Sequence, residues 1–119
     1  MARTLLLTED VLPTGRVRCS FDEELPRVAL TGEVDIDTCP QFDAAYAELA
    51  RRTPTHVVLD LAGVTFFSCS GLTFVARLNL HLGRTGHRVW IVSPSRASAR
   101  VLGLTGFAWD TDLPASALA

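Results

Sequence analysis

Residues 57–72 read VVLDLAGVTFFSCSGL, and this stretch decides the fold of the chain. Its first part, Val57 to Leu61, is an apolar run with β-branched side chains, which is typical of a strand covered on both faces. Gly63 is predicted to end that strand, and Phe66 and Phe67 to anchor the returning chain in the core. A polar turn over residues 68–70 follows and a helical pattern begins there, so this turn is the predicted place of function. The first N–H groups of such a helix lack partners, which suits a hydroxyl cap or a phosphate.

The elements before this stretch are predicted to be two strands and a helix. Residues 16–21 and 27–32 alternate with a period of two and suggest an antiparallel pair. The helix is predicted to begin near Thr38, because Thr38 and Gln41 match a capping box and Pro40 falls in the first turn. Its predicted buried stripe is Phe42, Ala45, Tyr46, Leu49 and Ala50.

After the stretch the chain alternates helix and strand. A helix is predicted over residues 70–82, a buried strand over 88–92, and a second helix capped by Ser93 with Pro94 at its first position. The predicted inward residues of these helices are Leu72, Val75, Leu78 and Leu82, then Ala97, Val101, Leu102 and Leu104. A last short strand is expected over residues 107–109. Its Trp109 is expected either to pack in the core or to form a contact surface.

This order of elements predicts an α/β sandwich with a mixed sheet of four or five strands and helices packed against it. Residues 16–119 are expected to form this single domain. Residues 1–15 are expected to form an extension or an extra edge strand.

The amino-acid composition and the net charge limit the classes of function that this chain can have. The 119 residues are 48% hydrophobic and 20% charged, as in an ordinary globular protein. The net charge of -2 and the scattered arginines argue against a nucleic-acid partner. No uncharged apolar stretch approaches membrane-spanning length, and the apolar run before Glu9 and Asp10 is too short for a secretory signal. A cytoplasmic protein that does not contact the membrane is therefore expected.

The histidines and cysteines, the residue types that most often bind metals or carry redox chemistry, are not spaced as they are in metal or redox sites. His56, His81 and His87 are dispersed and are expected at the surface or at caps. The three cysteines, Cys19, Cys39 and Cys69, have no metal-ligand spacing and are expected to be reduced thiols, with a Cys39–Cys69 bridge as the alternative. We therefore expect no metal and no cofactor.

The turn also lacks the partners that catalysis would need. A phosphatase loop needs an Arg six residues after Cys69, where Val75 stands, and a thioredoxin-like site needs a second Cys where Leu72 stands. The chain has no Lys, and both a phosphate-binding loop and a response-regulator receiver need one. Asp60, which a receiver would use at the end of its strand, is therefore expected to form a hydrogen bond with nearby backbone instead. An enzyme is therefore not expected.

Four stretches in order carry a family resemblance: 31–35 (TGEVD) with the helix start near Thr38, 59–64 (LDLAGV), the turn at 68–72, and 102–107 (LGLTGF). Together they resemble the STAS domain, the family of bacterial anti-sigma-factor antagonists, over about residues 16–109. The resemblance implies the α/β sandwich, and it implies that Asp35 lies beside the phosphorylation turn.

The turn departs from the family pattern, which is usually Asp-Ser-Ser-Gly-Leu. This chain has Ser68-Cys69-Ser70-Gly71-Leu72, so the family's phosphorylated serine falls on Cys69. Ser70 and then Ser68 are the substitute phosphorylation candidates, although either can simply cap the helix and Cys69 can simply pack as a small thiol. The resemblance implies a partner-binding surface made of Asp35, Thr38, Ser68, Cys69, Ser70, Gly71 and Leu72.

The resemblance implies an antagonist that binds an anti-sigma factor, a serine kinase of the histidine-kinase-like ATPase type, and so releases a sigma factor for transcription. Two alternatives within the family are a scaffold subunit of the stressosome kind and an accessory subunit of a lipid-transport complex.

Overall fold

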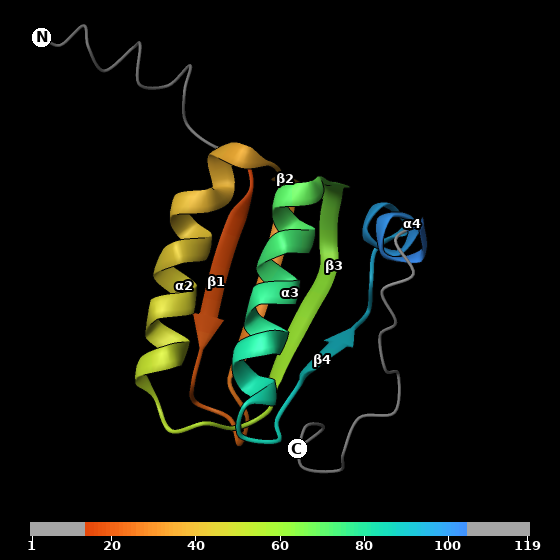
Figure 1. Ribbon diagram of the computed structural model, residues 1–119. Coiled ribbons are helices and arrows are strands. Elements are labelled where there is room, and N and C mark those ends of the chain that lie inside the picture. Colours follow the sequence, from red (N-terminus) through yellow and green to blue (C-terminus); the bar gives the residue numbers. More distant parts are fainter. Residues whose placement is uncertain (1–13, 105–119) are drawn as a thin grey trace, which may run out of the picture.

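The computed structural model describes residues 14–104 (Figure 1). Along the chain the elements are β1 (Arg16–Ser20), β2 (Arg27–Val34), the 3-10 helix η1 (Ile36–Thr38), α2 (Cys39–Arg51), β3 (Val57–Phe67), α3 (Cys69–Gly83), β4 (Val89–Val92) and α4 (Arg96–Leu104). The strands form one four-stranded sheet in the order β1-β2-β3-β4. β1 runs antiparallel to β2, while β2, β3 and β4 are parallel, which confirms the predicted mixed sheet.

Helices α2 and α3 lie side by side across one face of the sheet, and α4 lies next to the upper part of β3 (Figure 1). The two helices meet the sheet through their apolar stripes. The ring of Phe42 stacks on that of Phe74 with centroids 4.5 Å apart. Phe42, Ala45 and Leu49 are buried as predicted, whereas Tyr46 is half-buried and Ala50 is exposed. None of the helices within residues 14–104 combines the length and the apolar character needed to cross a bilayer.

Strand β3 is longer than the sequence indicated, and the prediction that Gly63 ends it is wrong. β3 continues to Phe67, and its pairing with β2 shifts by one residue, from Ala29 opposite Asp60 to Thr31 opposite Gly63. A Cβ on Gly63 would lie 2.8 Å from Cγ2 of Thr31. Gly63 therefore lets two strands approach at a bulge, which is a common use of glycine inside a strand.

The two phenylalanines at the end of β3 have different environments. Phe67 is 3% exposed and lies in the core, as predicted, but Phe66 is 49% exposed. Consecutive strand residues point to opposite faces, and Phe66 pairs with the exposed Glu33 while Phe67 pairs with the buried Val34. The prediction of a core role for Phe66 is therefore wrong.

Helix α2 begins next to Thr38 as predicted, but the predicted Thr38–Gln41 capping box is wrong. The capping box lies one turn earlier, around η1: Asp35 Oδ1 accepts from Ile36 N at 2.7 Å, and Thr38 Oγ1 accepts from Asp35 N at 3.1 Å. The amide of Gln41 binds β1 instead, because its Oε1 accepts from Val17 N at 2.8 Å and its Nε2 donates to Gly15 O at 3.0 Å.

Ser93 does not cap the last helix, which corrects another prediction. It takes a left-handed conformation with φ of 48°, and α4 begins three residues later. Ser95 N donates to Leu61 O at 3.2 Å, which fixes the chain against β3, and Ser95 Oγ then accepts from Ser98 N at 3.1 Å. Leu104, predicted to face inward, is 79% exposed. Most of the predicted N-terminal extension (residues 1–13) and the predicted strand over 107–109, with Trp109, lie outside the described residues.

Candidate functional site

The loop after β2 and the turn after β3 meet at one end of the sheet. The two strands are parallel, Val34 is paired with Phe67, and Ser68 N donates to Val34 O at 3.0 Å. Because the next residue after Val34 is Asp35, the structure places Asp35 beside Ser68. The parallel pairing of the strands thus produces the juxtaposition that the family resemblance implied.

The Ser68 hydroxyl is the N-cap of α3. Ser68 Oγ accepts from Ser70 N at 3.1 Å, and the carbonyl of Ser68 accepts from Gly71 N at 3.1 Å. Helix α3 therefore begins at Cys69, one residue before the predicted start. The side chain of Cys69 is exposed, while those of Ser68 and Ser70 are half-buried. The most accessible side chain of this turn is thus a thiol rather than a hydroxyl.

The seven residues predicted to bind a partner differ in how far the fold buries them. Thr38 is 0% exposed and Gly71 is buried, so both lie beneath the surface. A Cβ on Gly71 would lie 2.6 Å from Cε1 of Phe67, which explains the glycine at this position. The other five are accessible to different degrees: Asp35 and Cys69 are exposed, and Ser68, Ser70 and Leu72 are half-buried.

Next to this turn lies a surface that the sequence reasoning missed. A cavity of about 320 Å³ is lined by Thr14, Glu33, Asp35, Asp37 and Phe66. Ile36, the first residue of η1, lies between Asp35 and Asp37 in the sequence and is 74% exposed, and Phe66 is 49% exposed. We call Glu33, Asp35, Ile36, Asp37 and Phe66 the acidic–apolar surface. The alternation of β3 was the only indication in the sequence that Phe66 faces outward.

The three thiols are free, which agrees with reduced cysteines and not with a Cys39–Cys69 bridge. Burial is the main cause that raises the pKa of Cys19, and the nearby Glu48 carboxylate raises it further. Cys39 lies near the turn, because it lines a cavity of about 140 Å³ between α2 and α3 together with Ser70 and Phe42.

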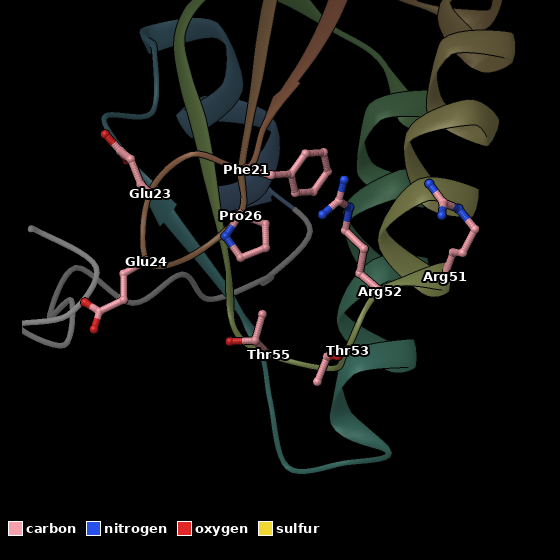
Figure 2. Close-up of a pocket in the computed structure, with 8 residues that line it drawn as sticks. All are labelled: Phe21, Glu23, Glu24, Pro26, Arg51, Arg52, Thr53 and Thr55. Atoms are coloured by element: carbon pink, nitrogen blue, oxygen red, sulfur yellow. The ribbon is translucent and has the colours of Figure 1, made fainter.

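The opposite end of the sheet has a larger cavity, of about 410 Å³, between the β1–β2 turn and the end of α2 (Figure 2). Phe21 and Arg52 point toward one another across it, and the guanidinium of Arg52 lies 3.5 Å from the Phe21 ring centroid (Figure 2). Arg51 and Arg52 also both pair with Glu48. Glu48 thus offsets one of these two positive charges, and the contacts of Arg52 with both Glu48 and Phe21 argue for a role in holding α2 against the turn.

Two of the histidines are not dispersed as predicted. The rings of His56 and His87 lie 5.0 Å apart at the start of β3 and β4, and the ring of Trp90 lies 5.9 Å from that of His56. His56 Nδ1 accepts from Arg88 N at 3.1 Å. Burial first, and then the neighbouring His87, lower the pKa of His56. Within residues 14–104 no three His, Cys, Asp or Glu side chains gather as metal ligands.

Comparison with known proteins identifies the family. The family model described as "Mlab, STAS domain" matches residues 17–111. The structure is similar to that of the anti-sigma factor antagonist SpoIIAA in its unphosphorylated form, with a TM-score of 0.73 and 17% identity over 87% of this chain and 92% of that one. It is also similar to an anti-sigma factor antagonist from Mycobacterium paratuberculosis, with a TM-score of 0.64 and 30% identity over 77% of this chain and 78% of that one. The search of curated proteins finds no match. The chain belongs to the STAS domain family.

Proposed function

We propose that this protein is an anti-sigma-factor antagonist. It binds an anti-sigma factor in the cytoplasm and so releases a sigma factor for transcription, and it acts by binding rather than by catalysis. The observation that carries the proposal is the exposed start of α3 at Cys69, next to Asp35. The 30% identity to the M. paratuberculosis antagonist supports the same role.

We further propose that the partner is a serine kinase of the histidine-kinase-like ATPase type and that its usual switch is altered in this chain. A phosphoryl group adds about -1.5 to -2 charges, which disrupts a closely packed interface unless an Arg receives it. A kinase must hold one hydroxyl in line with the γ-phosphate. At the family position this chain presents the Cys69 sulfur.

The neighbouring serines are poor replacements for that hydroxyl. Ser68 Oγ is engaged as the cap of α3, accepting from Ser70 N at 3.1 Å. Ser70 is one residue further along the helix, where the side chain is rotated by about 100° around the axis. We therefore expect the unaltered chain to be phosphorylated slowly, with Ser70 ahead of Ser68.

The test combines the purified chain with a candidate anti-sigma kinase and ATP–Mg²⁺, followed by size-exclusion chromatography and intact-mass measurement. We expect a complex of the two proteins, little phosphorylation of the unaltered chain, and a single added phosphoryl group on Cys69→Ser at a rate at least about tenfold higher. Cys39→Ser is the matched control, because it makes the same change at the first residue of α2.

Two results would contradict different parts of the proposal. Large self-assemblies that form no complex with any candidate anti-sigma kinase would argue for the scaffold alternative and against an antagonist. Rapid phosphorylation of the unaltered chain at Ser68 or Ser70 would refute the altered switch and leave the antagonist role in place.

A further inference from the structure

One face of β1 and β2 carries exposed positive charge. The residues of these strands that pack in or against the core are Val17, Cys19, Val28 and Leu30. Because side chains alternate along a strand, the residues between them point to the other face of the sheet, namely Arg16, Arg18, Ser20, Arg27, Ala29 and Thr31. We call these six residues the basic sheet face. Helices α2 and α3 cover the opposite face of the sheet, and α4 lies next to β3 (Figure 1).

Two arginines of the basic sheet face, Arg18 and Arg27, are close to one another. Arg18 pairs with Ala29 and Ser20 pairs with Arg27, so the two arginines are diagonal neighbours with Cα atoms about 7–8 Å apart. Arg18 is exposed and Arg27 is half-buried. Neither takes part in an ion pair within residues 14–104. Both guanidinium groups are therefore available to carboxylates of another molecule.

The acidic–apolar surface has the complementary charge. Glu33, Asp35 and Asp37 line the same cavity of about 320 Å³. None of these three carboxylates belongs to an ion pair in the part of the chain that the structure describes. Ile36 and Phe66 add exposed apolar area beside them. Exposed apolar side chains next to charges of one sign are typical of a surface that binds a protein of the opposite charge.

The two surfaces are too far apart to neutralise one another within one molecule. Ala29 lies opposite Arg18, and the chain from Ala29 to Asp35 spans about 20 Å at the rise of a strand. The Debye length at physiological ionic strength is only about 8 Å. A second copy of the chain, in contrast, offers each surface its complement.

We propose that copies of this chain associate head to tail, with the acidic–apolar surface of one copy on the basic sheet face of the next. Asp35 and Asp37 of one copy then pair with Arg18 and Arg27 of the other. The contact joins two different surfaces, so it builds an open chain of copies or a ring rather than a symmetric dimer. Exposed ion pairs contribute little each, so the association is reversible and depends on concentration and salt.

This association would regulate the binding of the anti-sigma factor, a step that rests on the function proposed above. The acidic–apolar surface includes Asp35, which lies beside the Ser68 turn. Copies within an assembly have this surface covered, so the anti-sigma factor and the next copy compete for it. Addition of the anti-sigma factor is therefore expected to dissociate the assembly.

The first test is sedimentation velocity of the full chain over a series of concentrations. We expect the average mass to rise with concentration at physiological salt and to return to that of the monomer at about 1 M NaCl, where the Debye length is about 3 Å. The variants Arg18→Gln/Arg27→Gln and Asp35→Asn/Asp37→Asn should each lower the association constant by about tenfold, as the loss of two exposed ion pairs allows. Asn also caps helices well, so the second variant retains the cap at position 35.

The matched control is Arg84→Gln/Arg96→Gln. It removes the same number of charges from exposed arginines that lie outside the basic sheet face, at the end of α3 and the start of α4. It should leave the association constant unchanged.

A mixture of the two variants tests the head-to-tail arrangement directly. The Gln variant retains the acidic–apolar surface, and the Asn variant retains the basic sheet face. Neither assembles well alone, but an equimolar mixture should form pairs that contain one copy of each variant and should form nothing longer. Symmetric dimers of either variant alone would overturn the proposal, since they require a different contact.

Other results would also overturn the proposal. One is a chain that stays monomeric at every concentration; if that monomer still binds a candidate anti-sigma factor, the proposed function stands. Another is assembly that is equally strong in the Gln variant, the Asn variant and the control. An assembled fraction that does not change when a bound anti-sigma factor saturates the chain would refute the competition for the acidic–apolar surface.

Discussion

At the scale of single residues, the three thiols differ in reactivity for physical reasons. Cys69 is exposed at the first residue of α3, so a reagent in solution reaches its sulfur directly. Cys19 is half-buried, and burial together with Glu48 raises its pKa, so less thiolate is present at neutral pH. We expect iodoacetamide to modify Cys69 first and Cys19 last, at least about tenfold more slowly, by peptide mass spectrometry.

The control for this prediction is Cys69→Ser, which should remove the fastest modification by iodoacetamide and leave the rates at Cys19 and Cys39 unchanged. Equal rates at Cys19 and Cys69 would show that local burial does not govern the reactivity of these thiols.

Residue roles were predictable only where local chemistry decides them. A Ser ahead of a helix usually caps it, and Ser68 does. Asp60 bonds nearby backbone as expected, because its Oδ1 accepts from Ala62 N at 2.9 Å. Gln41 could not be predicted in the same way, since its partners Gly15 and Val17 are distant in sequence and are brought to it by the fold.

At the scale of elements, the junction of β3 and α3 depends on a glycine. Gly71→Ala would place a Cβ 2.6 Å from the buried ring of Phe67, which cannot move without displacing its neighbours. We expect this overpacking to lower the free energy of unfolding by about 1–3 kcal/mol, measured by urea denaturation.

Gly83→Ala is the matched control in the same helix, because no atom beyond the adjacent residues and the backbone of its own helix lies within 4 Å of the position that its Cβ would take. Alanine is the better helix former, so the free energy of unfolding should rise by up to about 1 kcal/mol. Equal stability changes at both positions would show that contact with Phe67 is not the reason for Gly71.

The positions of the elements were more predictable than their ends. The apolar run at Val57 identified β3, and the serine-rich turn identified the start of α3 within one residue. The continuation of β3 past Gly63 was not predictable, because it depends on the bulged pairing with β2. The exposure of Phe66 follows from that continuation, so the irregular pairing of β3 with β2 accounts for two wrong predictions.

At the scale of the whole molecule, the fold separates two ends of different character. The carboxyl ends of β2 and β3 carry the Ser68 turn and the acidic–apolar surface. The other end holds the cavity in which Arg51 and Arg52 are paired with Glu48. The order of the elements predicted the first end, because parallel strands bring their following loops together. The acidic–apolar surface was missed because its residues come from three places, namely the end of β2, η1 with its cap Asp35, and the last part of β3.

A double substitution in the acidic–apolar surface distinguishes these two ends. Exposed apolar side chains surrounded by charge are typical of binding surfaces, and the charges of Asp35 and Asp37 favour a basic partner. We expect Ile36→Ser/Asp37→Arg to weaken binding of the anti-sigma factor by about tenfold or more, by isothermal titration calorimetry, while the unfolding midpoint is retained. Both side chains are exposed, so the fold does not depend on them. Glu23→Arg makes the same kind of charge change at the opposite end and should leave the affinity unchanged. An equal loss of affinity in both variants would mean that net charge, and not the acidic–apolar surface, governs the association.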